Sequence, residues 1–188
     1  YMPEERGLYP RMRVRDQLVY LGQLCGGTGH DVGRIVDNWL EQKETNTAAA
    51  QGIKITGRNG AFPINVWVRG NRIRNCDYSA VRGNSASNIQ ISGNSVSDVR
   101  EVALYSEFSF EGAVIANNTV DGAAVGVSAC NFNEGGRIAV VQGNIIRNLV
   151  PKRPIGTAPD DDAGIGIYVE ADSSVTGNVI EAAGGLAI

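Results

Sequence analysis

The chain has 188 residues, of which 43% are hydrophobic, 20% charged and 6% aromatic, and its formal net charge is -3. This composition indicates a globular protein; it excludes a disordered tail, which would be less apolar, and a disulfide scaffold, which needs more than three cysteines. With 20 acidic against 17 basic residues and no long basic cluster, we expect no nucleic-acid partner, and no run of 18 apolar residues offers a membrane span.

The first 45 residues predict a short α-helical hairpin. In Asp31–Gln42 the apolar residues follow the i, i+3, i+4, i+7 spacing of one helical face, and a similar stripe runs from Val14 to Cys25 before Gly26 and Gly27. We therefore expect residues 1–45 to cap one end of the domain. Residues 46–63 are read as a linker with a first partial coil.

A repeat dominates residues 64–188. The six-residue pattern apolar, any, Gly or Asn, Asn, any, apolar occurs five times, and its central asparagines are 23, 24, 26 and 34 residues apart. Short alternating strands between Asn/Gly corners at this period are typical of a solenoid. We predict an all-β fold, a right-handed single-stranded parallel β-helix, with a structural asparagine ladder made of Asn71, Asn94, Asn118, Asn144 and Asn178.

Two alternatives bear on this repeat. Leucine-rich repeats have a similar period, but only Leu104, Leu149 and Leu186 occur after position 50, too few for that fold. The longer last interval contains three prolines and three aspartates in Val150–Asp162, which predicts a loop that leaves the fourth coil. An open end of such a stack exposes strand edges, so association into a homo-oligomer through that end is expected.

A second alternation within the repeats predicts the candidate site. If Val81, Leu104, Val127 and Ile167 face inward, their successors face outward. One outer column is then Arg82, Tyr105, Ser128 and Tyr168, with Lys54 below it, and the next is Asn84, Glu107, Cys130 and Glu170.

These side chains have more than one reading. Arg82, Tyr105 and Glu107 are the candidate catalytic residues, for uronate lyase, epimerase or glycosidase chemistry, while Lys54, Asn84, Tyr168 and Glu170 are candidate ligand-binding residues for a polysaccharide. The same columns are also compatible with solvated outer residues that have no catalytic role.

No metal site or cofactor is predicted. Asp160–Asp162 with Glu170 and Asp172 offer oxygen ligands for calcium, but a charged run in a proline-rich loop is more often simply solvated. The only histidine, His30, lies in the expected helical cap, and Cys25, Cys76 and Cys130 lack metal-binding spacing, so buried free thiols are expected.

Residues 64–188 resemble a bacterial family of twin-arginine-translocated repetitive proteins. The resemblance covers about two thirds of the chain and is carried by the stretches Ser79–Asn84, Glu101–Phe108, Phe110–Gly122 and Asn131–Arg137. It implies a β-helix exported to the periplasm or secreted. The export signal of that family is absent from this sequence.

The N-terminal residues are similar to the ATP-binding subunit of ABC transporters, from the Q-loop into the helical subdomain. Tyr1–Leu18, Tyr20–Leu21 and Trp39–Glu41 carry this similarity, with Glu4 where the family usually has the Q-loop glutamine. The GxxxxGK[ST] phosphate loop, the signature motif and the Walker B strand are absent from this sequence, so no ATPase activity is expected. The chain begins at Tyr1 and combines two unlike segments, which suggests a fusion or a piece of something longer.

The expected function is therefore a non-catalytic scaffold or carbohydrate-binding module. The alternatives are a polysaccharide-active enzyme that works on the outer face, and an ABC ATP-binding fragment without competence for nucleotide.

Overall fold

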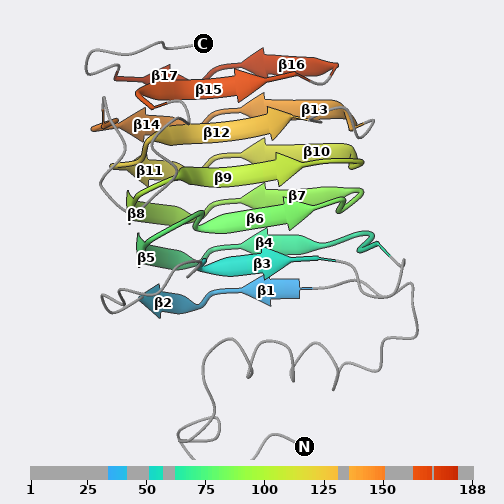
Figure 1. Ribbon diagram of the computed structural model, residues 1–188, viewed down its shortest axis with the longest axis horizontal. Coiled ribbons are helices and arrows are strands. Elements are labelled where there is room, and N and C mark those ends of the chain that lie inside the picture. The colour runs from blue at the N-terminus through green and yellow to red at the C-terminus, as the bar shows by residue number, and fades with distance from the viewer. Residues whose placement is uncertain are drawn as a thin grey trace, which may run out of the picture.

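The computed structural model describes residues 34–41, 51–56, 62–130, 136–150, 163–170 and 172–181. Its strands form three parallel sheets, in which each strand pairs with the strand three places later along the chain. The chain thus passes through all three sheets in each coil, and the coils stack from the N-terminal strands to the C-terminal ones (Figure 1). This is the parallel β-helix that the repeat predicts.

The three sheets are named A, B and C. Sheet A contains β1 (Arg34–Val36), β4 (Trp67–Arg69), β7 (Ile89–Ser92), β10 (Glu111–Ala116), β13 (Arg137–Gln142) and β16 (Ser173–Thr176). Sheet B contains β2 (Trp39–Glu41), β5 (Arg72–Cys76), β8 (Ser95–Val99), β11 (Thr119–Asp121), β14 (Ile145–Arg147) and β17 (Val179–Ile180). Sheet C contains β3 (Ile53–Ile55), β6 (Val81–Asn84), β9 (Val102–Glu107), β12 (Val125–Cys130) and β15 (Ile165–Val169).

The core lies between the sheets and is built from inward ladders of branched side chains. On sheet B, one such ladder places apolar residues above one another in register: Leu40, Ile73, Val96, Val120, Ile146 and Ile180. Phe110 is the largest fully buried side chain. Small and branched residues fill the narrow interior, which accounts for the low aromatic content of the chain.

An asparagine column turns the corner between sheets A and B. In Asn71, Asn94, Asn118 and Asn144 the backbone N–H and the side-chain Nδ2 both donate to the Oδ1 of the asparagine one coil later, at 2.9–3.0 Å. The column ends at Asn178 and also includes Asn38. Gly70, Gly93, Gly143 and Gly177 precede four of these asparagines at φ of 63–66°, a left-handed conformation that favours glycine.

The helix predicted for Asp31–Gln42 is wrong over Arg34–Glu41, which form β1 and β2. Ile35–Leu40 is a sixth copy of the corner pattern, with Asp37 at φ 55° in the place of glycine and Asn38 on the asparagine column. The apolar residues of two strands and a turn happen to match helical spacing. The other part of the predicted hairpin, from Val14 to Cys25, lies outside the described residues.

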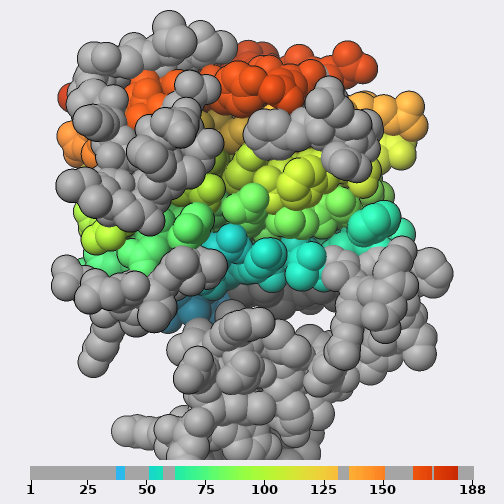
Figure 2. All heavy atoms as spheres, in the orientation of Figure 1, coloured from blue at the N-terminus to red at the C-terminus, as the bar shows by residue number. Residues whose placement is uncertain are grey.

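The described residues contain strands, turns and bends, and none of them belongs to a helix long and apolar enough to cross a membrane. Seen as spheres, the strands of sheet C follow one another in chain order up the molecule, from β3 to β15 (Figure 2). The predicted candidate residues lie on this sheet.

Candidate functional site

Sheet C brings the predicted outer columns together in register. Arg82 pairs with Lys54 on one side and with Tyr105 on the other, and Ser128 pairs with Tyr105 and with Tyr168. In the second column Glu107 lies between Asn84 and Cys130. The two predicted columns therefore agree with the register of sheet C.

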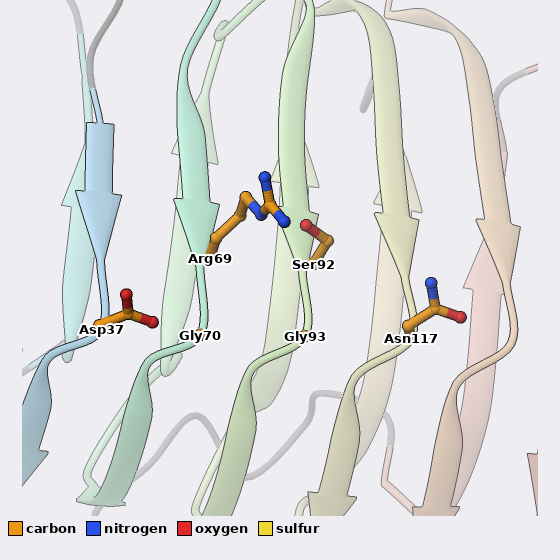
Figure 3. A pocket seen from close by; sticks show the side chains of 6 residues that line it. All are labelled: Asp37, Arg69, Gly70, Ser92, Gly93 and Asn117. Atoms are coloured by element: carbon orange, nitrogen blue, oxygen red, sulfur yellow. The ribbon is translucent and has the colours of Figure 1, made fainter.

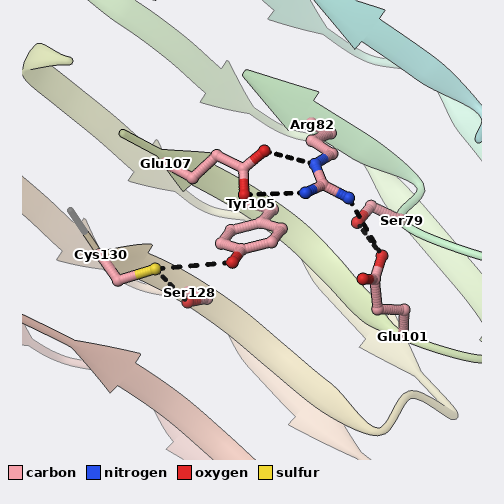
Figure 4. Close-up of polar contacts among 7 residues, drawn as sticks. All are labelled: Ser79, Arg82, Glu101, Tyr105, Glu107, Ser128 and Cys130. Carbon is pink, nitrogen blue, oxygen red and sulfur yellow. Dashed lines mark hydrogen bonds and ion pairs between the residues drawn. The ribbon is translucent and has the colours of Figure 1, made fainter. Parts of the chain in front are cut away.

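Arg82 is the centre of a polar cluster. Its guanidinium donates to both oxygens of Glu107, from Nε at 2.5 Å and from Nη2 at 2.9 Å, and it lies 5.0 Å from the centre of the Tyr105 ring (Figure 4). Glu101 approaches the same guanidinium at 3.7 Å and accepts a hydrogen bond from the Ser79 hydroxyl at 2.8 Å. The cation is thus shared between two carboxylates and one aromatic face.

The electrostatics of the cluster keep its arginine, phenol and thiol in their ordinary charge states. Burial alone would lower the pKa of Arg82, but the hydrogen bonds and charge of Glu107 outweigh it and raise that pKa. Burial raises the pKa of Tyr105 well above its usual range, and burial also raises the pKa of the Cys130 thiol. Near neutral pH we therefore expect a charged arginine, a neutral phenol and a neutral thiol.

The outer face of β9 and β12 is buried, unlike an open substrate cleft. Glu107 is 1% exposed and Tyr105 is 6% exposed, and the Cys130 thiol contacts the Tyr105 hydroxyl at 3.6 Å. A second apolar cluster lies on this side of sheet C, separate from the interior core: Val102, Tyr105, Val125, Cys130 and Ile165. The expectation that these columns are solvated is therefore wrong for β9 and β12.

The predicted ligand-binding residues are more accessible. Lys54, Tyr168 and Glu170 are exposed, and Asn84 is half-buried. The Tyr168 hydroxyl donates a short hydrogen bond to Glu170, which fixes the two side chains together at the C-terminal part of the sheet.

Metal ligands do not gather within the described part of the chain, where no three His, Cys, Asp or Glu side chains form a group able to hold an ion. Asp160–Asp162, His30 and Cys25 lie outside the described residues. Cys76 and Cys130 are buried free thiols.

Two surface hollows, neither anticipated from the sequence, flank sheet A at the two ends of its strands. One is lined by Asn65, Trp67, Asn88, Ile89, Gln90, Gly112 and Val114 and has a volume of about 280 Å³. The other, about 290 Å³, lies where the strands end and the chain turns into sheet B, and its lining is Asp37, Arg69, Gly70, Ser92, Gly93 and Asn117 (Figure 3).

The second hollow had a signal in the sequence. Its residues stand at the second and third positions of the corner pattern, just before the asparagine, where the first copies carry Asp37 and Arg69. The asparagines and apolar residues of that pattern define the repeat, and they carry no information about this hollow. The second and third positions face outward at the corner and determine its surface chemistry.

Comparison with known proteins gives one match that covers most of the chain. A family model described as "Right handed beta helix region" matches residues 37–188. No solved structure matches the chain.

Curated relatives match only a short part. An uncharacterized ABC transporter ATP-binding protein, YhaQ, of Bacillus subtilis is 55% identical over 42 residues, which are 22% of this chain and 14% of that protein. A second such protein, from Alkalihalophilus pseudofirmus, is also 55% identical over 42 residues, 22% of this chain and 16% of its own length. The chain therefore spans only a small fraction of these transporter subunits.

Proposed function

Since the chain belongs to the family of right-handed β-helix regions, we propose that it is a non-catalytic module that binds a carbohydrate chain on the outer side of sheet A. The family membership supports a scaffold or polysaccharide-related module. The choice between binding and catalysis depends on the chemistry of the side chains.

The state of Glu107 carries the non-catalytic part of the proposal. A general acid or base must reach the proton that it transfers. Both oxygens of Glu107 are held by Arg82, and the side chain is buried. The cluster is thus best explained as internal bracing between β6 and β9, in which charges that would be costly alone neutralise each other.

The hollows beside sheet A support carbohydrate as the ligand. Sugars present hydroxyl groups for hydrogen bonds and apolar ring faces for contact with aromatic side chains. The Asn65, Asn88 and Gln90 amides line the same hollow as the half-buried Trp67 at one end of the strands, and charged and polar groups line the other end. About 17 Å of backbone separates Asn65 from Gly70, room for a short oligosaccharide along β4.

A glycan array probed with the full chain tests the proposal, together with a turnover assay on every glycan that binds. We expect binding that is lost in Trp67→Ala and kept in Glu107→Gln, without any product. Formation of unsaturated or shortened sugar products would instead identify an enzyme. Binding of none of the glycans would remove carbohydrate recognition and leave only a scaffold.

A polysaccharide-active enzyme is the second candidate, because Tyr168 and Glu170 are exposed and hydrogen-bonded to each other on sheet C, with Lys54 exposed on the same sheet. A tyrosine and a carboxylate in contact are a suitable acid–base pair. Turnover abolished by Glu170→Gln would favour this candidate over the binding module.

Two further proposals concern where the module acts and how its copies associate. We infer from the resemblance of residues 64–188 that the module acts in the periplasm or after secretion, and that copies associate through an end of the stack. The short similarity to ABC ATP-binding proteins gives no nucleotide function, because the phosphate-binding loop is absent from this sequence.

A further inference from the structure

The two ends of sheets A and B present strand edges that match each other. Among the described residues, β1 and β2 are the first strands of these sheets, and β16 and β17 are the last (Figure 1). Every strand between them pairs in parallel with the strands of the coils before and after it. The first coil of one copy, placed on the last coil of another, would therefore continue the same parallel pairing.

The asparagine column ends at unpaired donors. At each earlier member of the column the backbone N–H and one Nδ2 proton donate to the next asparagine, as Asn144 does to Asn178. Asn178 donates one Nδ2 proton to the Val141 carbonyl, but no described residue accepts from its backbone N–H or from its second Nδ2 proton. The group that completes the pattern is the Oδ1 of one more corner asparagine, and Asn38 occupies that position in the first coil of a second copy.

The apolar core is less covered at these two edges than inside the stack. Val141 and Ile146 are 0% exposed, whereas Val175 and Ile180, one coil later on the same inward ladders, are half-buried. At the other end of the sheet B ladder Leu40 is also half-buried. Placing Leu40 of a second copy on Ile180 would extend the ladder and remove apolar surface from water on both copies.

The outward side of sheet B indicates that the partner is a second copy of this chain. Trp39 and Val179 lie at the two ends of one outward column of this sheet. They are 63% and 64% exposed, the highest values among the large hydrophobic residues that the structure describes. When the last coil of one copy meets the first coil of another, Val179 and Trp39 become neighbours at the strand spacing of about 4.8 Å, and each covers the other.

We propose that the protein assembles head to tail, with β1 and β2 of one copy paired in parallel with β16 and β17 of another. The inference rests on the proposed association of copies through an end of the stack, and it names the two surfaces that meet. These surfaces differ from each other, so every added copy leaves one of each kind open. The assembly is therefore an open filament and not a closed dimer.

Cysteine cross-linking tests the geometry of the junction. Within one chain, positions 39 and 179 are separated by five strand spacings, about 24 Å, whereas a disulfide needs Cα atoms about 4.4–6.8 Å apart. We expect mild oxidation of Trp39→Cys/Val179→Cys to give linked multimers in which peptide mapping joins position 39 to position 179. The parent chain, with its three cysteines, gives the background. Trp39→Cys/Ile145→Cys is the matched control and should give no such link, because Ile145 lies one coil away from the junction.

Sedimentation velocity of the full chain over a wide range of concentration measures the assembly itself. We expect the average mass of the parent to keep rising beyond that of a dimer. Val179→Glu and Trp39→Lys should each weaken association by about tenfold or more, because each places an unpaired charge in the junction. An equimolar mixture of the two variants should assemble again, since the two new charges are opposite where they meet. Ile145→Glu, on the same column but inside the stack, should stay within about twofold of the parent.

Other outcomes overturn the inference in distinguishable ways. Links that join position 179 to 179, or 39 to 39, as the main product would show that like ends meet, and so would a mass that levels off at a dimer. Failure of the mixed variants to assemble would show that Val179 and Trp39 do not face each other. A monomer at every concentration would overturn this inference together with the proposed association of copies. Carbohydrate binding would not be affected, because the glycan array tests it separately.

Discussion

Replacing an interior asparagine of the corner column should cost far more stability than replacing the last one. In Asn118→Ala the amide that is removed donates to Asn144 Oδ1 and to the Ile91 carbonyl and accepts from the N–H and Nδ2 of Asn94. Asn118 is 1% exposed, so water does not replace these bonds. The Asn94 side chain keeps its other hydrogen bond, to the Val68 carbonyl.

The magnitude follows from the groups left behind. Asn118→Ala leaves the Asn94 N–H and one Asn94 amide proton without partners, and it removes one hydrogen bond from the Ile91 carbonyl. Each unsatisfied buried group costs about 1–3 kcal/mol, and partial relaxation of the corner lowers the sum, so we expect a loss of about 3–5 kcal/mol in the free energy of unfolding.

Asn178→Ala is the matched control. Asn178 accepts from both nitrogens of Asn144 and donates to the Val141 carbonyl, but it is only half-buried. Water can satisfy part of what is lost there, and we expect a cost of about 1–2 kcal/mol. Urea unfolding followed by circular dichroism measures both variants. Equal losses, or a loss below about 1 kcal/mol in Asn118→Ala, would refute the role assigned to buried hydrogen bonds.

Three further predictions concern the strained backbone of β13, the Arg82–Glu107 ion pair and the buried thiols. Ile138→Gly should raise the free energy of unfolding by about 1 kcal/mol. Ile138 is 53% exposed and has a φ of 62°, which is unfavourable for a branched side chain. A lower denaturation midpoint in the variant would contradict this. Arg82→Met should lower the free energy of unfolding by about 3–5 kcal/mol, because it leaves the Glu107 carboxylate buried without a partner. The double variant Arg82→Met/Glu107→Leu should recover most of this loss in urea unfolding. A double variant no more stable than Arg82→Met would contradict the role of the ion pair. At pH 8 the Cys76 and Cys130 thiols should resist alkylation by iodoacetamide in the folded protein. Burial raises the pKa of both thiols, that of Cys76 to about 12, so the reactive thiolate is scarce. Peptide mapping that finds both cysteines alkylated as fast as free cysteine would disprove the prediction.

Much of the fold could be predicted because the repeat constrains every coil in the same way. A side chain of one coil has its equivalent above it, so the spacing of the asparagines predicts the register of sheets A and B. For the same reason Arg82, Tyr105 and Glu107 could be assigned to adjacent strands without any alignment. Two-residue alternation then decides which side of the sheet each one faces.

Three features could not be predicted in this way. The spacing of Ile35, Val36, Trp39 and Leu40 fits both a helical face and two strands around a turn, and only pairing with β4 and β5 distinguishes them. The burial of Glu107 depends on what covers the sheet, which alternation does not encode. The hollow at Gly93 arises from missing side chains on adjacent coils and becomes visible only when the coils are stacked.

The parallel pairing of every coil with the next has a mechanical consequence. When the two ends of the stack are pulled apart along its axis, the hydrogen bonds at an end coil carry the load one after another, as in a zipper, and not all together. Coils separated by 24 residues, such as those of Asn94 and Asn118, would each add about 80 Å of extended chain on release. A β-helix of this kind is thus an extensible element that lengthens in coil-sized steps under low force, while it stays rigid against bending.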